Sequence, residues 1–132
     1  MLIPATRYRD CEAALTFLTE VLAFEPLQVF RDDDGVLVHV ELKLGQGVFM
    51  FGPDRDNAFG RYMVHPDRAG GETTTIYAVV PDVAARHERA VAAGADVVLP
   101  LEAQPQGGSS FTLRDPEGHV WTFGDYDPGA AA

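Results

Sequence analysis

The sequence predicts an α+β fold made of two tandem modules, each with the element order β-α-β-β-β. A gapless internal shift of 72 residues relates the two halves of the chain, which is the pattern of a duplicated unit. Apolar residues recur with helical spacing early in each half, and they alternate with polar residues in a later segment, as in a strand. The shift places Asp10 on Asp82, Gly35 on Gly107, Val48 on Val120, Phe49 on Trp121 and Phe51 on Phe123.

The first half justifies its elements in order. Asp10 is a suitable N-cap for a helix of about three turns, whose apolar face follows the i, i+3, i+4 spacing at Ala14, Phe17, Leu18, Val21 and Leu22. A strand over 26–30 and a turn over 32–35 follow. Residues 36–44 then alternate, which predicts Val36, Val38, Val40, Leu42 and Leu44 on one face of a strand. A glycine turn over 45–47 leads into a last strand over 48–51.

The second half repeats this order. Residues 73–80 are β-branched and apolar, which predicts a strand; Asp82 then begins a helix that Gly94 ends. The segment Asp115-Pro116-Glu117-Gly118 fits a type I turn before the last strand. Between the halves, residues 53–72 have no clear period, so we expect a short helix or a covering segment there. We expect Phe59, Tyr62 and Met63 to pack at a cavity mouth or on a partner subunit.

A chain of 132 residues with 46% hydrophobic residues fits one packed domain over residues 1–132. Within it we expect a first module over 1–54, a connecting loop over 55–72 and a second module over 73–127. The formal charge of −10 disfavours nucleic acid and acidic membranes as partners and favours cationic small molecules. The start lacks the pattern of a signal peptide, no run is long enough for a membrane helix, and Cys11 stands alone. We therefore expect a cytoplasmic protein.

The second half ends in RDPEGHVWTF at residues 114–123, and the first contains HVELKLGQGVFM at residues 39–50. With the tandem modules, these segments resemble the vicinal oxygen chelate superfamily, and more narrowly its glyoxalase/bleomycin-resistance group. The resemblance covers residues 1–127. It implies curved mixed sheets around a cavity, the glyoxalase/bleomycin-resistance/dioxygenase fold, in a homodimer. The superfamily includes isomerases, dioxygenases, thiol transferases and drug-binding proteins, so the resemblance is specific for fold and not for chemistry.

Enzymes of this superfamily hold a divalent ion with His, Gln or Glu from the first and fourth strands of each module. Aligning the helix starts and the Asp-Pro-Glu-Gly turn with that pattern puts Ile3 and Thr75 on the first strands. Met50 and Thr122 then occupy the fourth strands. None of these four is a normal ligand of zinc, nickel, manganese or iron, so we expect no metal and no other cofactor.

A relocated metal site is the alternative. His39 and Glu41 are two residues apart on one strand, hence on one face, and could form half of a two-His-one-carboxylate set. A third ligand is difficult to find in the sequence. This alternative would make the protein a metal-dependent lyase, isomerase or dioxygenase; a thiol transferase is disfavoured because it would need the same metal.

The alternation also predicts which side chains line the cavity. If Phe49 and Phe51 face the helix, then Met50 faces the opposite side, which would give an apolar pocket with a few polar groups. The leading hypothesis is a metal-free, non-catalytic protein that binds a small organic molecule, with sequestration of a cationic or planar antibiotic as one use. The predicted ligand-binding residues are Arg7, His39, Glu41, Met50, Phe59, Tyr62, Thr75, Tyr77 and Thr122.

Overall fold

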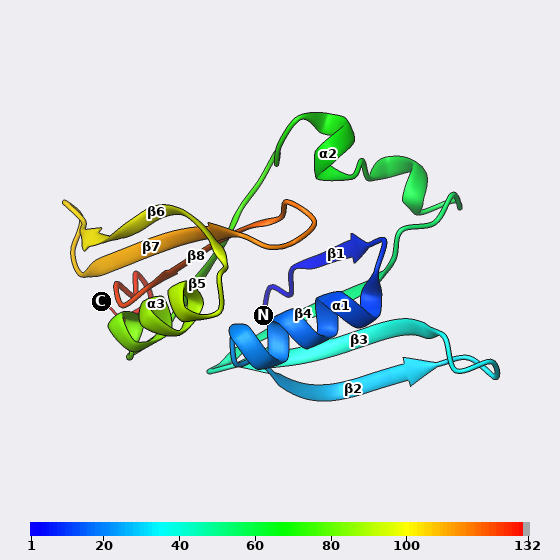
Figure 1. Cartoon of the computed structure of the whole chain (residues 1–132), viewed down its shortest axis with the longest axis horizontal. Coiled ribbons are helices and arrows are strands. Elements are labelled where there is room, and N and C mark those ends of the chain that lie inside the picture. Colours follow the sequence, from blue (N-terminus) through cyan, green and yellow to red (C-terminus); the bar gives the residue numbers. More distant parts are fainter. Residues whose placement is uncertain (131–132) are drawn as a thin grey trace. The chain divides into compact units, whose positions relative to one another are not determined.

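The computed structural model describes residues 1–130, so Ala131 and Ala132, the end of the predicted domain, lie outside the described residues. The chain divides into two compact units, Met1–Glu72 and the part that begins at Thr73. Each unit is a four-stranded mixed sheet with a helix against one face (Figure 1), which confirms the predicted fold class. Within residues 1–130, no helix is both long and apolar enough to cross a membrane.

The first unit contains a sheet of order β1-β4-β3-β2. Strand β1 runs parallel to β4, and the other neighbours are antiparallel. Because a parallel pair needs a crossover connection, the helix after β1 carries the chain back across the sheet. The elements are β1 (Ala5–Tyr8), α1 (Cys11–Thr16), η1 (Phe17–Val21), β2 (Glu25–Arg31), β3 (Leu37–Leu44), β4 (Gly47–Pro53), η2 (Gly60–Tyr62) and α2 (Pro66–Ala69).

The first helix begins where the sequence predicts. The Asp10 carboxylate accepts a hydrogen bond from the Ala13 amide at 3.0 Å, as an N-cap should. The helix continues from α1 into the π-helical segment η1, and the predicted apolar face is buried at Ala14, Leu18 and Leu22. These side chains share the core with Tyr8, Val40, Leu42, Phe49 and Phe51. The alternation argument for Phe49 and Phe51 is thus confirmed.

The second unit has the matching strand order, β5-β8-β7-β6, with β5 parallel to β8. Its helix begins after Asp82 and ends before Gly94, whose φ of +74° suits glycine, as predicted. The strand predicted over 73–80 is shorter, because pairing with β8 begins only at Ile76. The elements are β5 (Ile76–Val79), α3 (Val83–Ala92), β6 (Asp96–Ala103), β7 (Ser109–Arg114) and β8 (Val120–Gly124).

The internal repeat extends to individual hydrogen bonds. In the turn between β2 and β3, the Asp32 amide donates to the Val36 carbonyl at 2.9 Å; 72 residues later, the Gln104 amide donates to the Gly108 carbonyl at 2.9 Å. The parallel pairs have the same spacing, since Ala5 pairs with Met50 and Tyr77 with Thr122. The shift of 72 therefore describes equivalent positions in three dimensions.

One strand departs from the predicted alternation. On β2, the neighbours Phe30 and Arg31 pair with His39 and Leu37, so Val38 is the extra residue of a β-bulge. The bulge turns Leu37 into the core at 2% exposure, whereas Val36, predicted on the face of Val40, is 50% exposed. After the bulge, equivalent residues of β3 and β7 are 71 rather than 72 positions apart. Val40 pairs with Phe51 and Phe111 pairs with Phe123, and Phe51 and Phe123 are equivalent.

The predicted turn before β8 is confirmed, and it is held by a buried carboxylate. Asp115 is 4% exposed, and its Oδ1 accepts hydrogen bonds from the Glu117 and His119 amides, both at 3.0 Å. Its Oδ2 accepts from the indole Nε1 of Trp121 at 3.1 Å. One side chain therefore fixes both the turn and the largest core residue of the second unit.

We predict that Asp115→Asn lowers the free energy of unfolding by about 1 to 3 kcal/mol, because the new amide nitrogen would face the Trp121 N–H and leave a buried donor without an acceptor. Urea unfolding followed by Trp121 fluorescence measures the change. The matched control is Asp32→Asn in the exposed β2–β3 turn, where Oδ1 can still accept from the Asp34 and Val36 amides. Equal losses for the two variants would contradict the prediction.

Candidate functional site

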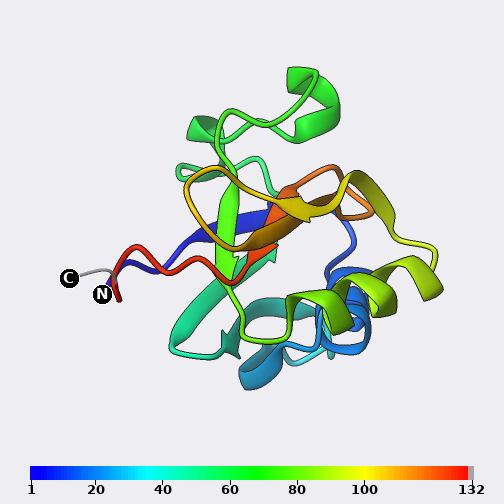
Figure 2. The same cartoon turned by 90° about the vertical axis from the view of Figure 1, so that its left-hand side faces the viewer.

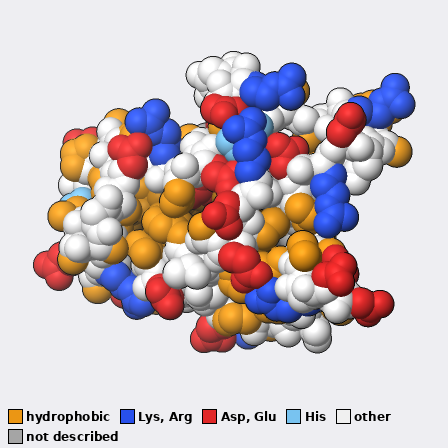
Figure 3. Space-filling model, turned by 45° about the vertical axis from the view of Figure 1, so that its right-hand side comes forward, with side chains coloured by type: hydrophobic (Ala, Val, Ile, Leu, Met, Phe, Trp, Pro, Cys, Tyr) orange, Lys and Arg blue, Asp and Glu red, His pale blue; other side chains and the backbone are white. Residues whose placement is uncertain are grey.

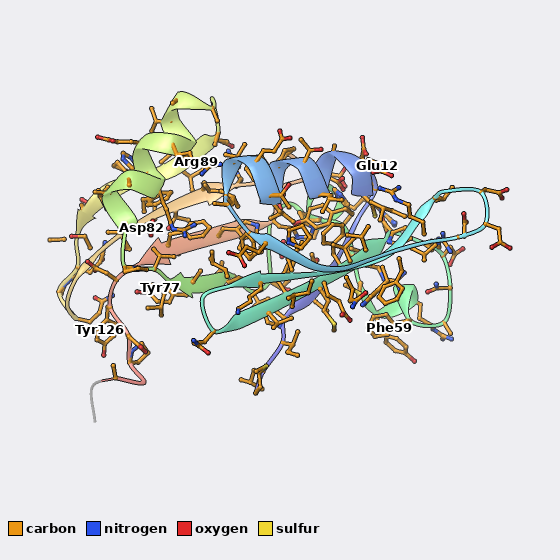
Figure 4. All side chains as sticks on the ribbon, turned by 90° about the horizontal axis from the view of Figure 1, so that it is seen from below. Glu12, Phe59, Tyr77, Asp82, Arg89 and Tyr126 are labelled. Atoms are coloured by element: carbon orange, nitrogen blue, oxygen red, sulfur yellow. The ribbon has the colours of Figure 1, made fainter. Side chains whose placement is uncertain are left out.

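The first unit contains a cavity of about 340 Å³ on the face of its sheet opposite α1. Strands β1, β3 and β4 form its floor, and the chain after β4 forms one wall. Figure 4 shows Phe59, from that wall, on the side of the sheet away from α1. The lining residues are Ala5, Thr6, Arg7, Val38, His39, Met50, Phe51, Gly52, Pro53, Arg55, Asn57 and Phe59.

The β-bulge shapes the floor of this cavity. Because the bulge interrupts the alternation, the neighbours Val38 and His39 both contribute to the lining. Gly52 on β4 lies beside it, and a Cβ there would stand 3.1 Å from the Val38 carbonyl oxygen. Glycine at position 52 thus leaves room for the bulged backbone.

Arg7 forms hydrogen bonds with the segment that follows β4 (green in Figure 2). Its Nη1 donates to the carbonyl oxygens of Pro53 and Arg55 at 3.3 and 3.4 Å. Its guanidinium carbon lies 5.1 Å from the centre of the Phe59 ring, within the range of a cation–π contact. One strand residue therefore holds the loop that forms the cavity wall.

The loop is also tightly wound on itself. The Asn57 side-chain oxygen accepts from the Gly60 amide at 2.8 Å, and the Asn57 amide donates to the Arg55 carbonyl at 3.1 Å. Gly60 is buried, and a Cβ at this position would lie 2.0 Å from the Arg55 carbonyl oxygen. No side chain other than hydrogen fits this turn.

We predict that Gly60→Ala forces residues 55–62 out of this conformation, because the clash is with backbone and cannot be relieved by a side-chain rotation. Amide hydrogen exchange at Asn57 and at the residues next to position 60 should accelerate, while exchange in α3 should not change. The control is Gly47→Ala, where the nearest atom to a new Cβ is at 3.4 Å, an ordinary contact. Unchanged protection of the loop in Gly60→Ala would refute this account.

A second set of contacts, between Arg9 and the carboxylates of Asp54 and Asp67, holds the same segment further along. Arg9 Nη2 donates to Asp67 Oδ1 at 2.9 Å and Nη1 to Oδ2 at 2.5 Å, while Nε lies 3.6 Å from Asp54. The His65 ring nitrogen Nδ1 lies 2.9 Å from Asp67 Oδ1. The hydrogen bonds from Arg9, and then the one with His65, lower the pKa of Asp67.

The lowered pKa of Asp67 predicts how the contact between Arg9 and Asp67 depends on pH. Because the pKa of Asp67 is lower in the folded chain than its ordinary value of 3.8, its stabilisation is complete above that value and is lost as the pH falls through the folded pKa. An NMR titration of the Asp67 carboxyl carbon should show this, and Arg9→Gln should move the midpoint upward. Arg68→Gln, a neighbouring exposed arginine, is the control and should leave the midpoint in place. A titration of Asp67 that Arg9→Gln does not alter would rule this contact out.

Four of the predicted site residues, Arg7, His39, Met50 and Phe59, line the cavity. Glu41 is not in the lining but lies next to it on β3, with its Oε2 3.1 Å from His39 Nε2. Tyr62 is 78% exposed and does not line the cavity; its ring lies 5.5 Å from the Arg61 guanidinium. Sequence reasoning missed Arg55 and Asn57, which lie on an irregular loop where no periodicity indicates side-chain direction.

The other three predicted residues belong to the second unit. Thr75 is exposed and precedes β5, so the prediction that it lies on the strand is wrong by one residue. Thr122 shares a hydrogen bond of 2.7 Å with the hydroxyl of Thr112 across the sheet. The Tyr77 hydroxyl donates to the Tyr126 carbonyl at 2.7 Å. Burial, and then the Asp125 charge, raise the pKa of Tyr77.

The positions that correspond to the metal ligands of the superfamily that the sequence resembles do not fit a divalent ion here. In the structure Ala5 pairs with Met50 and Tyr77 with Thr122, each two residues along the chain from the predicted first-strand positions Ile3 and Thr75. Alanine, methionine and threonine offer no strong donor to these metals, and the Tyr77 hydroxyl is used in a hydrogen bond of 2.7 Å to the Tyr126 carbonyl. Across residues 1–130, no group of three or more His, Cys, Asp or Glu side chains is arranged to hold a metal ion.

The chain consists of two β-α-β-β-β units, and in each unit the first strand runs parallel to the last. This architecture defines the class of protein as one built from two tandem modules with mixed sheets. The family model of the glyoxalase/bleomycin resistance protein/dioxygenase superfamily matches residues 4–123, and the chain belongs to this superfamily.

Individual relatives agree with this assignment. The chain is 35% identical over 117 residues to Uncharacterized protein Mb0911c of Mycobacterium bovis, covering 87% of this chain and 76% of that protein. Its structure is similar to that of TioX from Micromonospora sp. ML1, with a TM-score of 0.74, 32% identity and coverage of 93% and 95% of the two chains. It also shares its fold with lactoylglutathione lyase from Agrobacterium tumefaciens, with a TM-score of 0.63, 22% identity and coverage of 94% and 91%.

Proposed function

We propose that this protein binds a small organic molecule in the cavity of its first unit, without a metal ion and without catalysing a reaction. The observation that carries the proposal is the cavity itself, whose volume of about 340 Å³ lies in the range of small-molecule sites. Its floor is mostly apolar, at Ala5, Val38 and Met50, and a few polar groups stand at its wall. Sequestration of an antibiotic, as in the resistance branch of the superfamily, would need only such a pocket.

The enzyme alternative rests on one specific observation, the contact of 3.1 Å between His39 Nε2 and Glu41 Oε2 at the edge of the cavity. The pair would supply two ligands of a relocated metal site. A two-His-one-carboxylate site needs a third, and the described residues bring none to this pair. The pair is therefore better explained as a hydrogen bond across one strand face. The homodimer and the cytoplasmic location stay predictions from the sequence.

The proposal predicts that a thermal-shift screen of planar aromatic compounds yields ligands that raise the melting temperature. Binding of such a ligand should weaken at least about tenfold in Ala5→Trp, which fills the floor of the cavity, the loss expected when about 1.4 kcal/mol of binding free energy disappears. Ala13→Trp is the control, because Ala13 is exposed on α1. A screen without any ligand, or equal binding by both variants, would defeat the proposal.

Metal analysis of the purified protein separates the two functions. The binding-protein proposal predicts no stoichiometric zinc, nickel, manganese or iron. A stoichiometric ion that is lost in His39→Ala would support the enzyme alternative instead, because that residue would then be a ligand.

A further inference from the structure

The charges around the cavity oppose the charge of the whole protein. The chain carries a formal charge of −10, and Figure 3 shows acidic and basic side chains interspersed over the face in view. The cavity lining, however, contains Arg7, Arg55 and His39 and no Asp or Glu. A ligand inside the cavity therefore meets the two guanidinium-bearing residues Arg7 and Arg55 at short range, where charges are screened least.

Two carboxylates close to the lining in sequence or on the strand already have partners. Glu41, on the same face of β3, contacts His39 at 3.1 Å, and Asp54, at the start of the loop, contacts Arg9 at 3.6 Å. The Arg55 guanidinium, in contrast, has no hydrogen bond or ion pair within residues 1–130; only its backbone carbonyl is used. Arg55 thus brings an uncompensated charge to the loop that forms the cavity wall.

Arg7 can also contribute to an anion site. Its bonds to the Pro53 and Arg55 carbonyls, at 3.3 and 3.4 Å, are longer than usual N–H···O bonds. A carboxylate would accept stronger, charge-assisted bonds from the same guanidinium. Its position against the Phe59 ring keeps it at the cavity wall.

The remaining lining is suited to a flat apolar body. Val38, Met50 and Pro53 present apolar surface, and Phe59 adds an aromatic ring. The Phe30 ring lies 5.8 Å from the His39 ring on the same sheet face, which extends this surface toward β2. Aromatic rings contact such surfaces well and pair with other rings at these separations.

We infer that the cavity binds aromatic carboxylates, with the carboxylate at Arg55 and Arg7 and the ring on the apolar floor. The inference rests on the proposed function, since it specifies the ligand class of the same cavity. It reverses the ligand charge expected from the composition of the chain.

The test is isothermal titration calorimetry with three probes of one shape: 2-naphthoate, the neutral 2-naphthamide and the cationic 2-naphthylmethylammonium. We expect 2-naphthoate to bind at least about tenfold more tightly than the other two, as charge-assisted hydrogen bonds would give. Arg55→Gln should remove most of that preference while its affinity for 2-naphthamide stays within about twofold. Arg61→Gln, on the same loop but outside the lining, is the control and should bind as the wild type does.

The outcomes separate this inference from the proposed function. Equal binding of the three probes, tighter binding of the ammonium, or an unchanged preference in Arg55→Gln would overturn the inference and leave the cavity as a binding site. If none of the three probes binds, the inference is overturned, and the separate thermal-shift screen then decides whether the proposed function falls with it.

Discussion

The structure of each unit depends on the parallel pairing of its first strand with its last. In the first unit this register sets Arg7 opposite Gly52, so the guanidinium reaches the chain as it leaves β4 and bonds to the carbonyls at positions 53 and 55. In the second unit the same register sets Tyr77 opposite Thr122, and the phenol bonds to the carbonyl of Tyr126. In each half, a side chain on the sheet face opposite the helix, Arg7 or Tyr77 on the first strand, thus holds the segment that follows the last strand.

The contacts made by Arg7 and by Tyr77 differ in how closely they hold the following segment to the sheet. Arg7 is long and charged, and it holds a loop that stands at the rim of the first sheet and walls a cavity. Tyr77 lies directly over Gly124, where a Cβ would stand 2.5 Å from the phenol oxygen, so the segment it holds lies close to the second sheet. The two units therefore share a backbone plan but hold the segment after the last strand with different side chains, and in the first unit that segment walls a cavity.

Regular strands made much of this predictable from the sequence. Side chains alternate across a strand, so the burial of Phe49 and Phe51 implied that Met50 faces the cavity. The bulge at Val38 was not predictable in this way, because it is defined by pairing with β2 rather than by any local residue preference. Arg55 and Asn57 were missed for a related reason, since their positions depend on Arg7, which is distant in the sequence.

Net charge and the residues that line the cavity indicate different ligand charges, because net charge averages over the whole surface. Charges on distant parts of the molecule are screened by salt beyond about 10 Å, whereas a ligand in the cavity lies within a few ångströms of the lining. The expectation of a cationic ligand rested on the formal charge of −10, whereas the predicted acidic site residue, Glu41, contacts His39 and is not in the lining. The ligand class that we infer therefore depends on Arg55, with Arg7 beside it in the lining. The polarity of the site is therefore set by which charges are left without a partner, and that is a property of the folded loop.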